Sequence, residues 1–96
     1  MPLISQFYGI LIYMYRELGE HHNKPHIHIK YNEYEMSMTV NGDILNGKLP
    51  KKQQKLVEAW IEIHKDEIKA SWYALNNDDE VIKIKGLEWF VWDQKP

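Results

Sequence analysis

The sequence predicts an α+β domain in which an antiparallel β-meander carries one long or broken helix on one face. Residues 26–31 and 34–40 alternate apolar and polar side chains with a period of two, which is typical of half-buried strands. Residues 51–77 contain no proline or glycine and repeat apolar side chains at helical spacing. The stretch 80–92 alternates again and predicts a closing C-terminal strand. We therefore expect about four strands, a helical segment and this last strand.

Turn residues separate the predicted strands. β-Branched and aromatic side chains fill residues 7–16, which favours a first strand there. Asn32-Glu33 lies between the two alternating stretches, and asparagine tolerates the positive φ of a two-residue hairpin turn. Asn41-Gly42 is a stronger hairpin signal and leads into a short strand around residues 43–48.

The sequence indicates where the predicted helix begins, and it makes a straight helix longer than the domain comfortably holds. Pro50 suits its first position, because the N–H that proline lacks would have no intrahelical partner there. A straight helix over residues 51–77 would be about 39 Å long, more than a domain of this size spans comfortably. We therefore expect a break near Lys65–Asp66. His64 lies on the apolar stripe, which predicts a buried neutral imidazole bonded to a backbone carbonyl.

A two-residue turn at Asn32-Glu33 would fix the register of the central hairpin. Tyr31 then faces Tyr34, and the pairs that follow match in polarity: Lys30 with Glu35, Ile29 with Met36, His28 with Ser37, Ile27 with Met38, and His26 with Thr39. A slip of one residue would place isoleucines opposite polar partners. The register therefore directs the isoleucines and methionines toward the helix, and it directs His26, His28 and Lys30 away from it.

Composition excludes several classes of protein. The 96-residue chain has no cysteine, which excludes a disulfide scaffold and thiolate metal sites and suits the cytoplasm. Its formal net charge of −2 argues against a protein that coats nucleic acid by charge alone. The N-terminal stretch has no basic leader and is too short and interrupted for a membrane span. Without cysteine or a G-x-S-x-G motif, the residues do not support nucleophilic catalysis.

Four of the five histidines lie within residues 21–28. His26 and His28 are two residues apart on one predicted strand, so both point to the same side and could ligate one ion. His22, from the adjoining loop, would complete a three-histidine site for catalytic zinc or another divalent metal. Glu35, diagonal to His28, would join this catalytic site as a ligand or as the partner of one. Without metal, the histidine pair could cleave RNA by acid–base catalysis, and a purely structural role on the outer face fits the alternation equally.

The same outer face predicts contacts to RNA or to a protein partner. Tyr13 and Tyr15 alternate with apolar residues and would share this face with His26, His28 and Lys30. Tyrosine rings interleaved with donors on an open sheet are used by several single-strand RNA modules. Four lysines within eight residues would add a phosphate-binding cluster: Lys48, Lys51, Lys52 and Lys55. The alternatives are burial of the tyrosines against a second subunit and a solvated turn for the lysines.

Residues 86–96 form an aromatic extension of a predicted single domain over residues 1–85. Trp89 and Val91 would point to one side of a strand, and Phe90 and Trp92 to the other, so both faces are apolar. Such a strand predicts an interface in which Trp89 and Trp92 contact a second copy of the chain or another protein. The alternative is that it folds back over the open sheet face.

Three motifs span much of the chain: "ISQFYGILIYMY", then H-x-x-P-H-I-H-x-x-Y-x-E-Y-E, then G-K-L-P before a helix with W-x-x-x-H. Together they resemble a small bacterial family known as domain of unknown function 4160, over roughly residues 1–85. The resemblance places the family's characteristic positions on His22, Pro25, His26, His28, Tyr31, Glu33, Glu35 and His64. It implies a short chain encoded beside another small protein, in a toxin–antitoxin-like module without an established activity. Gln6 and Lys24 depart from the family pattern, which has Arg and Pro there.

Two functions follow from these observations. The first is a small cytoplasmic interaction module of toxin–antitoxin type, which binds a protein partner or RNA through its open sheet face, with a homodimer or a small protein encoded nearby as the expected assembly. The second is a metal-dependent hydrolase or RNase that uses His22, His26 and His28. Neither function requires a membrane.

Overall fold

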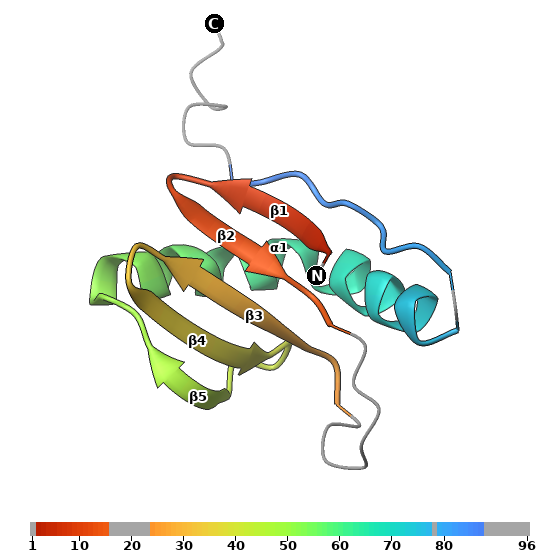
Figure 1. Ribbon diagram of the computed structural model, residues 1–96, viewed down its shortest axis with the longest axis horizontal. Helices are drawn as coiled ribbons and strands as arrows, with labels where there is room; N and C mark the ends of the chain where they lie inside the picture. The colour runs from red at the N-terminus through yellow and green to blue at the C-terminus, as the bar shows by residue number, and fades with distance from the viewer. Residues whose placement is uncertain (1, 16–23, 78, 88–96) are drawn as a thin grey trace, which may run out of the picture.

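The computed structural model describes residues 2–15, 24–77 and 79–87, which form one antiparallel sheet with a helix across one of its faces (Figure 1). The elements are β1 (Leu3–Phe7), β2 (Ile10–Tyr13), β3 (His26–Tyr31), β4 (Tyr34–Thr39), β5 (Ile44–Lys48) and α1 (Lys51–Asn76). The order of the five strands in the sheet is their order along the chain, so the sheet is a meander. The predicted α+β class is confirmed.

The N-terminal stretch forms a hairpin where the sequence predicted one strand over residues 7–16. Phe7 pairs with Ile10, and Tyr8 and Gly9 between them have φ of 50° and 79°. Positive φ at both residues matches the turn that two-residue hairpins prefer. The sequence pattern missed this turn because a bulky residue rarely adopts such a conformation. The sheet therefore has one strand more than the four that were predicted before the helix. The additional strand is β1, which begins N-terminal to the predicted stretch.

The central hairpin β3–β4 has the predicted register, from Tyr31 opposite Tyr34 to His26 opposite Thr39. Asn32 supplies the positive φ of its turn, 52°. The apolar residues that face α1 are at most 2% exposed: Ile27, Ile29, Met36 and Met38. Their burial specifies the register, because a slip of one residue would turn all four toward the opposite face.

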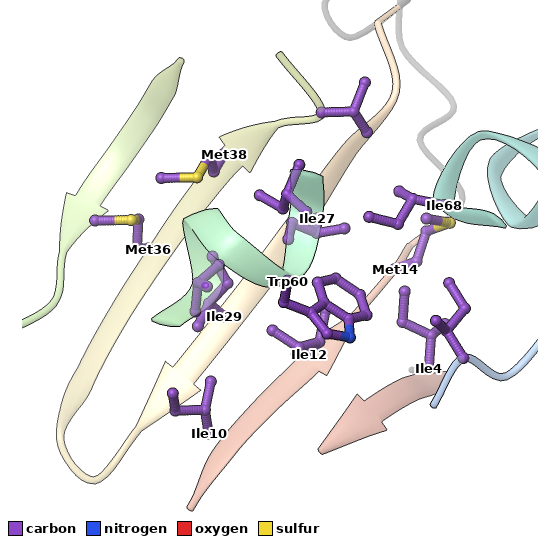
Figure 2. Close-up of a cluster of buried hydrophobic side chains, with 14 of the residues drawn as sticks. Ile4, Ile10, Ile12, Met14, Ile27, Ile29, Met36, Met38, Trp60 and Ile68 are labelled. Atoms are coloured by element: carbon purple, nitrogen blue, oxygen red, sulfur yellow. The ribbon is translucent and has the colours of Figure 1, made fainter. Parts of the chain in front are cut away.

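The core lies between the sheet and α1. Figure 2 shows Trp60 of α1 among isoleucines of β2 and β3, and Ile68 near Met14, which follows β2. Trp60 is fully buried, and its Nε1–H donates a hydrogen bond of 2.9 Å to the backbone oxygen of Lys85. Each buried isoleucine contributes about 1.5–3 kcal/mol relative to an exposed one, so this layer supplies much of the folding free energy.

α1 bends at His64, whose φ of −111° and ψ of 24° leave the helical region. The helix is therefore broken, one residue before the predicted Lys65–Asp66. The His64 ring lies 5.7 Å from the Trp60 ring, and its Nδ1 hydrogen-bonds to the Glu67 carboxylate, so the partner is not the predicted backbone carbonyl. No helix in the described part of the chain is long and apolar enough to cross a membrane.

Residues 79–87, the C-terminal segment, run beside β1 in an extended path that is not a strand (Figure 1). The Ile84 N–H donates to the Ile4 backbone oxygen at 2.7 Å, and the Ser71 hydroxyl bonds both the N–H and the carbonyl of Ile82. The predicted closing strand is wrong over these residues, because side chains of α1 satisfy backbone groups that a strand would pair in a ladder. Trp89, Trp92 and the rest of the predicted extension beyond residue 87 lie outside the described residues.

Gly47→Ala should destabilise the sheet strongly. Gly47 has φ of 77°, and a Cβ there would lie 2.1 Å from the backbone oxygen of Glu35. Because β4 or β5 must move, we expect the unfolding free energy in urea to fall by about 3 kcal/mol. Gly42→Ala is the matched control, since Gly42 has φ of 94° but no atom within 4 Å of an added Cβ. It should cost about 1 kcal/mol, and equal losses in the two variants would contradict the close approach.

Candidate nucleic-acid interface

The face of the sheet that points away from α1 carries aromatic and polar side chains, and we call it the open face. Alternation along β2 to β5 assigns it the following residues: Leu11, Tyr13, Tyr15, His28, Lys30, Glu35, Ser37, Asn46 and Lys48. No helix or strand of the described residues covers it (Figure 1). Tyr13, Tyr15 and Lys30 therefore share one face, as the sequence predicted.

Strand register arranges these side chains in two rows that cross the sheet. One row runs Leu11–Lys30–Glu35–Lys48, and the other runs Tyr13–His28–Ser37–Asn46. A carboxylate thus lies between two ammonium groups in the first row, while the second holds hydroxyl, imidazole and amide groups. Directly opposite side chains have Cβ atoms about 4.5–5.5 Å apart, so the side chains of each row lie next to one another and form a continuous surface.

Aromatic rings gather at the β2 end of the second row. The ring planes of Tyr13 and Tyr15 are within 7° of parallel, with centroids 6.3 Å apart. The Lys30 ammonium lies 5.5 Å from the Tyr13 ring centre, within the range of a cation–π interaction. His28 is 4.3 Å from the Tyr15 ring, measured between ring centres. The rings, the cation and the imidazole therefore form one contiguous patch.

A pocket of about 350 Å³ lies beside this patch on the open face. Its polar walls come from His28, Lys30, Glu35, Ser37 and Asn46, and Tyr15 completes the aromatic side. His28 Nδ1 and Ser37 Oγ share a hydrogen bond of 3.1 Å, which orients the imidazole.

Ser37 and Asn46 belong to this pocket, but the sequence reasoning did not select them. Ser37 was already placed opposite His28 by the predicted register, so extending that row across the sheet would have identified it. Asn46 is harder to place, because the pairing of β4 with β5 shifts between Ser37 and Met38 and leaves Leu45 as an extra residue.

His26 does not lie on an exposed surface as the sequence predicted. It pairs with Thr39 as expected, but it is only 2% exposed. Its Nδ1–H donates to the Lys24 carbonyl at 2.9 Å, and its ring lies 4.9 Å from Trp72 of α1. The C-terminal half of the helix therefore reaches the first residue of β3, a contact between distant parts of the chain that alternation cannot reveal. The His26 and His28 rings remain neighbours, with centres 5.2 Å apart.

The predicted metal site of His22, His26 and His28 keeps the status of a prediction. His22 lies outside the described residues. Among the residues that are described, no group of three histidine, cysteine, aspartate or glutamate side chains is arranged to hold an ion.

The predicted lysine cluster is divided by the fold. Lys48 ends one row of the open face, whereas Lys52 lines a different pocket beside the first turns of α1. Lys51 and Lys55 are exposed on the helix. The four lysines therefore do not form a single surface with the tyrosines. The second pocket also contains Tyr8, which the sequence reasoning missed because residues 7–16 were predicted as one strand.

Comparison with known proteins identifies a family. A family model described as "Domain of unknown function (DUF4160)" matches residues 9–73. The matched region runs from the β1–β2 turn into the C-terminal half of α1 and so includes most of the open face. No curated protein and no solved structure matches the chain. The family description names no activity.

His26→Ala should destabilise the fold even when a chelator is present. The substitution removes the ring that packs on Trp72 and leaves the Lys24 carbonyl without its donor. We expect the unfolding free energy in urea with EDTA to fall by about 2 kcal/mol. An unchanged value would contradict the structural role. Stoichiometric zinc in tag-free protein, together with a wild-type melting temperature lowered by EDTA, would instead support the metal site.

Proposed function

The chain belongs to the DUF4160 family, and we propose that it binds single-stranded RNA through the open face of its sheet. The observation that carries this proposal is the near-parallel pair Tyr13 and Tyr15, with the Lys30 ammonium against one ring and a polar pocket beside the other. Stacking rings next to cations and hydrogen-bonding groups on an uncovered sheet match what unpaired bases require.

The rings favour single strands over duplexes. Bases in a single strand can turn their faces onto aromatic side chains, and each such stack is worth about 1–3 kcal/mol. A duplex keeps its bases stacked on one another and presents mainly phosphates, which are bound by charge. The formal net charge of −2 makes charge alone a poor source of affinity for this chain. Stacking therefore has to supply most of the affinity.

Charge on the open face supports a limited number of phosphate contacts. Lys30 and Lys48 flank Glu35 in one row of the sheet, so two ammonium groups face the same side. Two phosphate contacts to a single strand predict a slope of about −1.4 for log K against log salt concentration. Such a weak dependence distinguishes this mode of binding from that of a strongly basic protein.

The polar pocket supplies groups that can read the edge of one base. Asn46 offers both a donor and an acceptor, Ser37 a hydroxyl, and Glu35 an acceptor for exocyclic amino groups. These groups lie on β4 and β5, within a continuous ladder that fixes their relative positions. Binding groups held on strands are more precisely placed than groups on loops. The pocket therefore favours a preference for base type at one position of the RNA.

The toxin–antitoxin setting belongs to the same proposal. An RNA-binding chain of this size would act in such a pair either on cellular RNA or by holding the RNA of its partner. A small protein that covered the open face would compete with RNA for Tyr13 and Tyr15. Competition between a co-expressed neighbouring protein and RNA is therefore the expected form of regulation.

Tyr15→Leu should weaken RNA binding by about tenfold, because it removes one stacking surface while keeping apolar bulk. Fluorescence anisotropy with labelled ten-nucleotide single strands, titrated at several salt concentrations, measures both the affinity and the slope. Tyr73→Leu is the matched control, since Tyr73 is 60% exposed on α1 and lies away from the open face. It should leave the affinity unchanged.

Three results would overturn the proposal. One is the absence of binding to any single-stranded RNA, and another is an equal effect of the Tyr15 and Tyr73 substitutions. The third is stable binding of a small partner protein through Tyr15 with no RNA affinity, which would make the open face a protein interface. Metal-dependent cleavage of the RNA, lost on His28→Ala, would instead support the hydrolase.

A further inference from the structure

A second pocket, of about 440 Å³, lies where the β1–β2 turn, the end of β3 and the first turns of α1 meet. Its lining consists of Tyr8, Tyr31, Lys52, Gln53 and Leu56. We propose that this pocket binds a nucleotide monophosphate, with the base against the two tyrosines and the phosphate on Lys52. Because three lining residues come from α1, the pocket is on the helix side of the sheet and is separate from the open face.

The backbone at Tyr8 indicates that this tyrosine has a role beyond forming a turn. Tyr8 has φ of 50°, close to the 52° of Asn32 in the β3–β4 turn. Asparagine adopts this conformation readily, whereas a bulky residue there is a rare and costly choice. Tyr8 is also 46% exposed, with its ring edge-on to the Phe7 ring at 6.3 Å between centroids, so much of the residue remains at the surface. A strained residue kept at the rim of a pocket is typical of a ligand contact.

Tyr31 and Leu56 give the pocket a firm apolar wall. Both are partly buried and pack against the hydrophobic core. A Cβ added at Gly9 would lie 3.5 Å from the Tyr31 ring, so the ring lies close to the β1–β2 turn. The core therefore supports this wall, and an aromatic and aliphatic surface of this kind suits a planar ring.

Charge at the opening of the pocket selects an anion. Lys52 lines the pocket, and Lys51 and Lys55 are within three residues of it on α1. The first turn of α1 contains no acidic residue. Lysines at a helix N-terminus oppose the helix dipole, so helix stability does not explain them. A planar ring joined to a phosphate satisfies both the tyrosines and Lys52, and Gln53 adds a donor and an acceptor for its polar edges.

A phosphate-bearing nucleotide could reach the pocket as a free mononucleotide or as the 5′ end of an RNA chain. Both sources present the same base and phosphate, and a volume of about 440 Å³ lies within the usual range for small-molecule sites. Isothermal titration with the four ribonucleoside 5′-monophosphates tests the first source. The second is tested by comparing 5′-phosphorylated with 5′-hydroxyl forms of one RNA oligonucleotide.

Two substitutions test the site without threatening the fold. Tyr8→Asn keeps a residue suited to positive φ, so it should raise the melting temperature by about 4 °C while weakening nucleotide binding about tenfold. Lys52→Gln should weaken binding of the monophosphate about tenfold and leave the weaker binding of the matching nucleoside unchanged. Lys83→Gln is the matched control, because it removes the same charge from an exposed residue of the C-terminal segment.

Opposite changes in stability and affinity for Tyr8→Asn would support the proposal, because a merely structural tyrosine would not give both. A preference for the 5′-phosphorylated oligonucleotide without binding of free monophosphates would support the RNA end as the ligand. Failure of the free monophosphates to bind, together with equal affinities for the 5′-phosphorylated and 5′-hydroxyl forms of the RNA, would overturn the proposal, because RNA bound on the open face alone would not distinguish the two ends. Binding that survives Tyr8→Asn and Lys52→Gln as well as it survives Lys83→Gln would overturn it too.

Discussion

The register of the β3–β4 hairpin is the constraint on which the rest of the structure depends. A two-residue turn with Asn32 at positive φ sets six cross-strand pairs at once. Because side chains alternate along a strand, these pairs sort every residue of both strands onto one of two faces. One face becomes a sheet of isoleucine and methionine on which Trp60 packs (Figure 2). The other face places lysine beside glutamate and histidine beside serine.

The helix and the C-terminal segment close one side of that sheet and protect one of its edges. The bend at His64 lets both halves of α1 bury residues, with Trp60 before it and Ile68 after it. Trp60 and Ser71 then hold the C-terminal segment through its backbone, and Ile84 bonds to β1. At the other edge, every residue of β5 is exposed, but its irregular pairing and Lys48 are features that discourage pairing with other strands. The uncovered face thus rests on a rigid support, as a binding surface requires.

The two pockets differ in chemistry because they lie on opposite sides of the sheet. The pocket on the open face is walled by polar side chains of β3, β4 and β5 and opens onto paired tyrosine rings. The pocket near α1 has a firm apolar wall and a lysine at its mouth. The pocket on the open face suits an extended RNA single strand that lies across the sheet. The pocket near α1 suits a single planar group that carries a charge. The division of the lysine cluster leaves Lys48 with Lys30 on the open face and Lys52 at the pocket near α1.

The sequence by itself determined the alternation of faces, the central register, the helix and its break, because these follow from local periodicity and turn chemistry. The sequence therefore predicted that Tyr13, Tyr15, His28 and Lys30 share the open face. Only the tertiary structure decided that His26 is buried, since Trp72 lies 46 positions later in the chain and its approach depends on the bend of α1. The path of the C-terminal segment and the pocket beside Tyr8 were decided in the same way, whereas the β1–β2 turn was missed because tyrosine rarely adopts a positive φ. Contacts between residues far apart in sequence leave no periodic signal, and they form only once the core has fixed the positions of the elements.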